Sequence, residues 1–380
     1  MICNKKDCTG CFACYNICPK NAIKMIHDDN GFIYPEIDIE KCINCNLCKK
    51  VCPAINKLEY QEIQSCYAAQ RKNINKLNES SSGGVASVFA ESIVKNGGIV
   101  YGATYEKSYQ LHFIRVDNLK DINKLKGSKY VHCYIEDSYK NIKKDLINKK
   151  TVLFIGTPCQ IAGLKLFLMK DYDNLICVDL ICHGVPSQKY LKDELDKNID
   201  INKITGLTFR NNNNYMIAGK NNNKVIINIP IEKSRYLRGF LDCFFLRENC
   251  YKCKYANPKR ISDITIGDFW GIESDSKFYQ NKSNCISVIL INNTKGNIFF
   301  NKCKKMLNLE KRNINEAING NSQLRHPALI QKNYYKFKKD YPKYGFNKSY
   351  DKNRRFANLK VKLAKIEIIR KMYYIIKRSK

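Results

Sequence analysis

Two short cysteine-rich stretches near the N-terminus repeat a single spacing, and this repeat limits what the chain can fold into. The first stretch, CTGCFACYNICP, starts at Cys8, and the second, CINCNLCKKVCP, starts at Cys42. Every cysteine of the first stretch has a counterpart 34 residues further along in the second. A constant offset of this kind indicates a duplicated module with pseudo-twofold symmetry.

Two iron–sulfur clusters explain this repeat. Clusters of iron and sulfide need soft thiolate ligands, and two residues between cysteines let a tight loop direct three sulfurs at one cubane. In two-cluster ferredoxins the fourth cysteine, which is followed by proline, reaches the other cluster. The sequence therefore predicts one [4Fe–4S] cluster on Cys8, Cys11, Cys14 and Cys52, and a second on Cys42, Cys45, Cys48 and Cys18.

Zinc is the alternative metal for such cysteines. It is usually bound by two separated CxxC pairs and does not need an eight-cysteine frame. Cys3 lies outside the frame and is expected to be incidental.

Composition indicates a globular protein of a reducing compartment. The chain has 380 residues, 44% of them hydrophobic, so it can bury a core in more than one domain. It has nineteen cysteines and no apolar signal segment, which favours metal or redox use over disulfides and predicts a cytoplasmic location. No run of eighteen apolar residues occurs, so no membrane span is expected.

The formal net charge is +31. One interpretation is a Lys- and Asn-rich composition bias. Bound cofactors would offset some of the charge, because a [4Fe–4S] core with four thiolates carries about −2. The remainder could attract an acidic partner, an anionic substrate or a lipid surface.

Beyond the cysteine frame the pattern changes to helices and strands. The stretch SSSGGVASVFAESIVKNGG, residues 80–98, predicts an amphipathic helix with a Ser/Gly start and a Gly-Gly stop. Free N–H groups at that start suit a phosphate, and ordinary N-capping is the alternative. From Thr151, the strands TVLFIG and LICVDLIC flank a helix in TPCQIAGLKLFL, which implies a parallel sheet. Both strand-end turns lie where open α/β sheets bind ligands.

Four more cysteines stand in ligand-like places. Cys159 and Cys182 occupy the two strand-end turns, and Cys250 and Cys253 form a CxxC pair. Together they fit a third [4Fe–4S] cluster. The CxxC could instead be a dithiol couple, and the two turn cysteines could be small core residues. The remaining cysteines are best interpreted as core residues: Cys66, Cys133, Cys177, Cys243, Cys285 and Cys303.

Six ordered motifs carry a family resemblance. They are SSGGVASVFAE, KGSKYVH, GTPCQIAGLK, CHGVPS, CYKCKYA and SDITIGDFWG, which run from about residue 80 to residue 269. In this order they resemble the coenzyme F420 hydrogenase/dehydrogenase beta-subunit family, here with a two-cluster ferredoxin domain in front.

The resemblance implies a cofactor and its site. Members of that family are flavoproteins that bind FAD and an iron–sulfur cluster and exchange electrons with an organic acceptor. It supports Cys159, Cys182, Cys250 and Cys253 as ligands of the family's own cluster. It implies FAD near the Ser/Gly turn, the KGSKY loop and the two strand-end turns. The residues expected there are Ser81, Ser82, Gly83, Gly84, Lys129, Thr157, Pro158, His183 and Gly184.

Several nearby residues have two interpretations. Asp263 and Asp268 match the family's acidic motif, and turn chemistry is the alternative. His183 is either a proton donor or a structural histidine. Trp270 either packs on the cluster or fills the core.

The predicted fold class is α+β and α/β. A small two-cluster ferredoxin-like domain, residues 1–60, precedes a mixed α/β domain that binds flavin and a cluster. That domain divides into residues 61–146 and 147–325. Residues 326–380 are expected to form a basic, aromatic tail with an amphipathic helix near its end.

The tail suggests three roles. For the amphipathic helix of the last stretch, docking on the body is preferred, and peripheral contact with an anionic membrane surface is the second choice. Basic residues mixed with tyrosines can also bind single-stranded nucleic acid, but no nucleic-acid-binding signature accompanies them, so such a partner is not expected.

The sequence therefore predicts an iron–sulfur flavoprotein oxidoreductase. Ferredoxin or another redox donor would supply electrons, and a small organic acceptor, F420 or another compound, would receive them through FAD. Bacterial members with a fused ferredoxin domain also resemble proteins encoded beside cell-surface polysaccharide genes. The alternatives are a non-catalytic electron-transfer subunit that serves a partner enzyme, and a cluster-stabilised binding protein without flavin.

Iron content tests the cysteine assignments. Three [4Fe–4S] clusters would give about twelve iron atoms per chain. Iron and sulfide assays on anaerobically purified protein measure this number. A value near eight would remove the third site, and zinc in place of iron would contradict the cluster interpretation.

Overall fold

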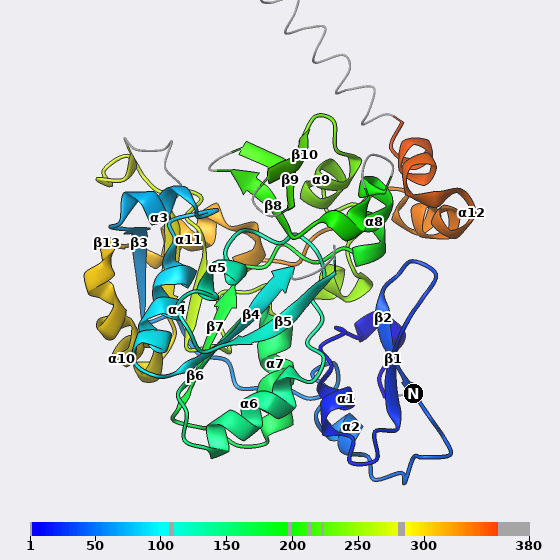
Figure 1. Ribbon diagram of the computed structural model, residues 1–380, viewed down its shortest axis with the longest axis horizontal. Helices are drawn as coiled ribbons and strands as arrows, with labels where there is room; N and C mark the ends of the chain where they lie inside the picture. The colour runs from blue at the N-terminus through cyan, green and yellow to red at the C-terminus, as the bar shows by residue number, and fades with distance from the viewer. Residues whose placement is uncertain are drawn as a thin grey trace, which may run out of the picture.

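The computed structural model describes residues 2–105, 110–196, 200–211, 214–221, 224–279 and 286–355. In it an N-terminal module, residues 2–56, lies against one side of a larger α/β body (Figure 1). Within these ranges no helix combines the length and apolar character needed to cross a membrane. Cys285 and the amphipathic helix predicted near the C-terminus fall outside the described residues.

The N-terminal module consists of two equivalent halves. It contains a two-stranded antiparallel sheet and two short helices: β1 (Ile23–His27), β2 (Ile33–Ile37), α1 (Ala13–Ile17) and α2 (Leu47–Lys50). The cysteine loops before α1 and α2 also match in backbone conformation. Gly10 and Asn44, which are equivalent in the repeat, both have positive φ values, 66° and 53°. The next equivalent pair, Phe12 and Asn46, does too, at 62° and 56°. Because positive φ is uncommon outside glycine, this agreement supports the duplication.

The body is built on an eight-stranded mixed sheet in the order β13-β3-β12-β11-β7-β6-β4-β5. The four neighbours β11, β7, β6 and β4 are parallel, and the remaining pairs are antiparallel. The predicted parallel strands are therefore confirmed as β6 and β7. The strand bounds are β3 (Ser65–Arg71), β4 (Ile99–Tyr105), β5 (Leu111–Val116), β6 (Val152–Gly156), β7 (Leu175–Leu180), β11 (Ile264–Asp268), β12 (Ser287–Ile291) and β13 (Leu307–Arg312).

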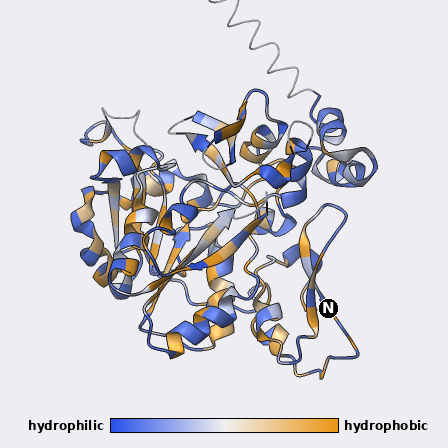
Figure 2. Cartoon of the chain, viewed as in Figure 1, coloured by the Kyte–Doolittle hydropathy of each residue, from blue (hydrophilic) through white to orange (hydrophobic). Residues whose placement is uncertain are grey.

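Helices cover both faces of this sheet because its strands are apolar on alternating sides (Figure 2). Leu153 of β6 packs in a cluster with α4 and α10, whereas Val152 and Phe154 pack on the opposite face with α6 and α7. Helix α4 confirms the predicted Ser/Gly-started helix and ends before Gly97. The helices are α3 (Ile74–Asn78), α4 (Val85–Lys95), α5 (Ile122–Leu125), α6 (Ser138–Ile147), α7 (Pro158–Leu168), α8 (Gln188–Leu195), α9 (Arg235–Leu241), α10 (Thr294–Cys303), α11 (Ile314–Gly320) and α12 (Tyr334–Asn353).

A second, antiparallel sheet lies beside the body, next to α8, α9 and α12 (Figure 1). Its strands are β8 (Gly206–Asn211), β9 (Asn214–Asn221) and β10 (Lys224–Pro230), in the order β10-β9-β8. The basic aromatic segment after Leu324 forms α12 and docks through its rings, whereas the terminal helix for which docking was preferred lies outside the described residues. Tyr190 of α8 packs edge-on against Tyr341, with ring centroids 4.7 Å apart, and Phe337 is fully buried. These rings are therefore not exposed for stacking on nucleic-acid bases.

Candidate functional site

The structure groups the eight repeat cysteines as the sequence predicted. Cys8, Cys11, Cys14 and Cys52 line one small cavity of about 20 Å³, and all four are buried. The second cavity, of about 30 Å³, is lined by Cys18, Cys42, Cys45 and Cys48. The fourth cysteine of each stretch thus lies with the first three of the other. We call these groups the first and second cysteine sets.

The two sets differ in their access to solvent. The second set lies at the surface, and its Cys45 is exposed. In the first set, burial raises the pKa of the Cys11 thiol to about 12, and the nearby Cys52 and Cys8 add to the effect. Burial likewise raises the pKa of Cys14, with Cys11 and Cys8 contributing. Four thiols in one dry site repel as thiolates, so this donor set suits a positively charged iron core.

Cys3 lies in the cavity of the first set, beside Cys8 and Cys52. Hydrogen bonds to these two sulfurs and burial raise the pKa of Cys3 far above its ordinary value. Cys3 stands outside the repeated spacing, so the sequence does not indicate this proximity, and its expected incidental role stays a prediction.

A third cysteine set forms in the body. Cys159 begins α7, Cys182 follows β7, and Cys250 and Cys253 lie in and after the turn Glu248–Lys252. Burial raises the pKa values of Cys159 and Cys182 to about 12, and thiolate neighbours raise both values further. Burial raises the pKa of Cys250, and all three of the other sulfurs add to this effect. The four cysteines that the sequence singled out are therefore neighbours in space.

Among the described residues, no group of three or more His, Cys, Asp or Glu side chains has the arrangement of a single-ion site. One zinc ion would draw four sulfurs to about 2.3 Å from its centre. A cubane places its own iron and sulfide between the thiolates, so it needs a wider set.

Hydrogen bonds fix the loops of the third set. Backbone N–H groups point at its sulfurs, as from Gly184 to Cys182 Sγ at 3.4 Å. The loop after Cys182 pairs with the segment before Cys250 through a bridge between Pro186 and Leu246. Such N–H contacts to sulfur are one means by which proteins set cluster potentials.

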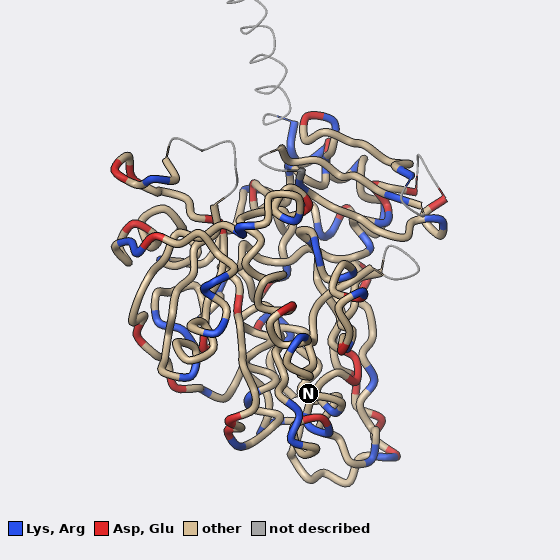
Figure 3. The backbone as a smooth tube through the Cα atoms, turned by 60° about the vertical axis from the view of Figure 1, so that its left-hand side comes forward, with Lys and Arg blue, Asp and Glu red and all other residues tan. Residues whose placement is uncertain are grey.

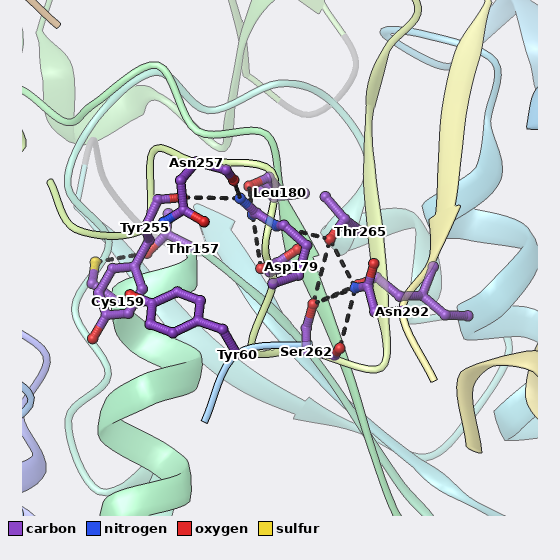
Figure 4. Close-up of polar contacts among 12 residues, drawn as sticks. Tyr60, Thr157, Cys159, Asp179, Leu180, Tyr255, Asn257, Ser262, Thr265 and Asn292 are labelled. Atoms are coloured by element: carbon purple, nitrogen blue, oxygen red, sulfur yellow. Dashed lines mark hydrogen bonds and ion pairs between the residues drawn. The ribbon is translucent and has the colours of Figure 1, made fainter. Parts of the chain in front are cut away.

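Arg260 joins the loop after Cys253 to the end of β7. Its guanidinium donates to the carbonyls of Tyr255 and Asn257 at 2.9 and 3.2 Å, and to the Asp179 carboxylate at 2.9 Å (Figure 4). Arg260 and Asp179 are 2% and 0% exposed, so this ion pair is shielded from water. Tyr255 is two residues from Cys253, and Asp179 is three residues from Cys182. Because Arg260 binds both Tyr255 and Asp179, it fixes the Cys253 and Cys182 sulfurs relative to each other.

A cavity of about 430 Å³ adjoins the third set, and the predicted cofactor segments converge on it. They are the Ser/Gly turn before α4, the loop around Gly127, the turn at Thr157 and the turn after β7. The expected flavin residues in its wall are Ser81, Ser82, Gly84, Lys129, Thr157, His183 and Gly184. Gly83 and Pro158 do not line it. Gly83 packs on β3, where a Cβ would lie 2.2 Å from the Ala69 carbonyl oxygen.

Two helices begin at this cavity, and they differ in capping. At α7, Thr157 and Gln160 form a reciprocal capping box that uses the first free N–H groups. At α4, Gly84 is the N-cap and no side chain caps the helix. Uncapped N–H groups at a helix start are donors for an anion. The start of α4 is therefore the better phosphate site of the two.

The lysines of the KGSKY loop are engaged within the protein. Lys129 Nζ donates to the carbonyls of Leu125, Lys126 and Gly127 at 2.8 to 3.0 Å, and burial lowers its pKa to about 8. Lys126 pairs with Glu79 at 2.6 Å. The phosphate contact expected from Lys129 is therefore replaced in this structure by bonds that shape the loop.

An aromatic residue also lines the cavity. Trp270 lines it and is 46% exposed, so it neither fills the core nor packs within the cysteine set. Arg210 lies over the Trp270 ring at 5.6 Å and pairs with Asp268 at 2.6 Å. Asp263, the other acidic motif residue, accepts from the Cys177 N–H at 2.7 Å, which is a structural role.

His183 is held as a neutral ring. Its Nε2 lies 3.0 Å from the Phe240 carbonyl, which only accepts, so Nε2 carries the proton. Its Nδ1 accepts from the Gln323 amide at 3.0 Å. Burial lowers the pKa of His183. Since both ring nitrogens have protein partners, the structural interpretation is favoured over proton donation.

Together, the fold and these sites define an iron–sulfur protein in which a dicluster module joins an α/β body. The family profile of the 4Fe-4S dicluster domain matches residues 7–55. A second profile, which describes the C terminus of the beta subunit of coenzyme F420 hydrogenase/dehydrogenase, matches residues 149–317. Residues 149–317 thus match the C-terminal region of the coenzyme F420 hydrogenase/dehydrogenase beta-subunit family, and residues 7–55 match a dicluster ferredoxin domain in front of it. The chain is therefore an iron–sulfur electron-transfer protein related to oxidoreductases.

Individual relatives match different parts of the chain. An uncharacterized ferredoxin of Methanocaldococcus jannaschii is 40% identical over 53 residues, which are 14% of this chain and 68% of the ferredoxin. The coenzyme F420-dependent sulfite reductase of the same organism is 23% identical over 287 residues. That match covers 68% of this chain but only 42% of the reductase.

Among solved structures, a chain of the F420-reducing [NiFe] hydrogenase complex from Methanosarcina barkeri is similar. The match covers 71% of this chain and 93% of that chain, at 17% identity and a TM-score of 0.47.

Serine substitution tests the third set. Cys253→Ser should lower the iron content by about four atoms per chain, because a [4Fe–4S] cluster loses one of its ligands. The two N-terminal sets lie in a separate module, so their EPR signals in the reduced protein should persist. Cys303→Ser is the matched control, because Cys303 is fully buried in α10 and belongs to no set. Loss of the N-terminal signals in Cys253→Ser would contradict the assignment.

Proposed function

We propose that this protein passes electrons from a ferredoxin-type donor, through three [4Fe–4S] clusters and FAD, to a small organic acceptor of the F420 type. Two electrons taken singly from the donor, with a proton from solvent, would make one hydride equivalent for the acceptor. The observation that carries this proposal is a shared turn. Residues 182–185 provide a cysteine to the third set and also line the cavity.

The positions of the cysteine sets suggest the order of transfer. The second set is at the surface, where a donor protein can approach Cys45. The first set is buried, and its Cys11 lies against α7, which begins beside Cys159. Tyr255 lies near Cys159, Cys11 and Cys253: burial raises its pKa most, and these thiolates add to the effect. The first set is thus placed between the surface and the third set.

The cavity fits a flavin dinucleotide in its chemistry. The uncapped start of α4 forms a polar end suited to a diphosphate, and Ser81, whose Oγ accepts from the Ser128 N–H at 2.7 Å, lies beside it. Tyr130 and Phe240, stacked with centroids 4.7 Å apart, line an apolar region suited to a ring system. When bound, FAD would convert single-electron supply into two-electron delivery.

A non-catalytic electron-transfer subunit is the second candidate. The chain spans 42% of the F420-dependent sulfite reductase that it matches. In this case a partner enzyme would supply the acceptor site, and turnover with a small acceptor would distinguish the two functions. Both candidates retain the proposed division at residues 60, 146 and 325.

Charge substitution in the Ser/Gly turn tests the flavin site. Gly84 is unsuitable, because its φ is +75° and an added Cβ would lie 3.1 Å from Arg71 and Ser80, so any side chain there is strained. Ser82 lines the cavity and has an ordinary backbone. Ser82→Glu should weaken FAD binding at least tenfold, because it places a carboxylate beside the diphosphate. Flavin content and a binding titration measure this loss.

Ser82→Gln has the same size without the charge and should retain FAD within a few fold, while iron content holds in both variants. If both variants kept stoichiometric FAD, the phosphate would bind elsewhere. If both lost it equally, the effect would be steric rather than electrostatic.

A further inference from the structure

Arg247 connects the N-terminal module to the body through a buried guanidinium. The residue is 1% exposed. Its Nε donates to the Cys8 carbonyl and its Nη2 to the Ile33 carbonyl, both at 2.8 Å. The group also lies 4.3 Å from the centre of the Tyr34 ring. All these contacts are with the N-terminal module.

The backbone of Arg247 belongs to the third cysteine set instead. Its N–H donates to the Val185 carbonyl at 2.8 Å, in the loop that follows Cys182. Its own carbonyl accepts from the Cys250 N–H at 2.9 Å. Arg247 therefore spans the distance between a ligand loop of the third set and Cys8 of the first.

The charge of this guanidinium is not balanced by a carboxylate. In the described part of the chain no Asp or Glu forms an ion pair with Arg247, and its Nη1 is buried without a hydrogen-bond partner. His132 packs near it, and burial followed by the Arg247 charge lowers the pKa of that ring, so His132 adds no charge. Glu248, the next residue, pairs with Lys6 and Lys338.

An unpaired buried charge is costly, because the ion loses its hydration shell and gains no opposite charge in return. Cysteine sulfurs are among the groups that favour the charged form of Arg247: Cys8 contributes most, followed by the Tyr34 hydroxyl and Cys250. A [4Fe–4S] core with four thiolates carries about −2 when oxidised and one charge more when reduced. A cluster on the first set would supply the missing counter-charge.

We infer that Arg247 is the counter-cation between the first and third clusters, and that it sets the reduction potential of the cluster on Cys8. This inference rests on the proposed function, because it presumes clusters on both sets. A fixed positive charge stabilises the more negative, reduced state of the cluster. Arg247 therefore makes this cluster easier to reduce and keeps its loop against the body. It acts through Cys8 and is a positioning residue.

The test is a redox titration of the full-length protein, monitored by EPR, in Arg247→Gln and Arg247→Lys. Arg247→Gln removes the charge, so the equilibrium constant for reducing one N-terminal cluster should fall at least tenfold, which is 59 mV for one electron. Arg247→Lys keeps the charge, and the constant should stay within about threefold of the wild type. Arg312→Gln is the control for losing a buried arginine, because Arg312 pairs with Asp275, Glu310 and Glu316, away from the cysteine sets. Its cluster potentials should not change.

Iron analysis of the two variants gives a second readout. Loss of iron from the first set in Arg247→Gln, with iron retained in Arg247→Lys, would confirm that the first cluster needs the positive charge. Unchanged potentials in Arg247→Gln, or equal loss of iron in both variants, would overturn the inference. A wild-type protein without any iron–sulfur signal would instead refute the proposed function, so the two failures are distinguishable.

Discussion

The close approach of Cys11 to helix α7 is the contact on which the arrangement of sites depends. At Gly163, one turn beyond Cys159, a Cβ would lie 2.9 Å from Cys11 Sγ and 3.0 Å from the Tyr139 hydroxyl. Only glycine leaves room for the cysteine loop at this point. The first cysteine set therefore lies directly against the helix whose start belongs to the third set. A larger residue would separate the N-terminal module from the body.

Electrostatics complement this packing. Burial, with neighbouring thiolates, raises the pKa values of Cys11 and Cys14 in the first set and of Cys159, Cys182 and Cys250 in the third, and a buried arginine stands beside each of these two sets. Arg260 has Asp179 as its partner and fixes one loop of the third set, whereas Arg247 lacks a carboxylate and faces the first set. Lys and Arg also spread over the whole chain trace (Figure 3), so surface charge alone does not single out a site. The two buried arginines, Arg260 and Arg247, are the positive charges that lie beside particular cysteine sets.

The sequence predicted much of this, for local reasons. Spacing alone grouped Cys8 with Cys52 and Cys42 with Cys18, because a duplicated loop has a single geometry around its cluster. Alternating apolar runs predicted β6, α7 and β7. The sequence could not indicate the places of Cys3, Gly163 or Arg247, because these arise from contacts between distant segments. The loop sequence suggested that Lys129 binds an anion, but its ammonium group donates hydrogen bonds to three local carbonyls. Trp270 was expected to pack on the cluster or to fill the core, but it follows the end of β11 and lies in the cavity wall.

The central claim is that the N-terminal module feeds electrons to the cavity through the first cysteine set. Anaerobic stopped-flow mixing of the FAD-loaded protein with a reduced ferredoxin tests it most directly, in the wild type and in Cys14→Ala. Without the first cluster, flavin reduction by the ferredoxin should slow at least a hundredfold, while the small reductant dithionite should reduce both proteins at similar rates. Equal rates with the ferredoxin would contradict the account, because electrons would then reach the cavity without passing the first set.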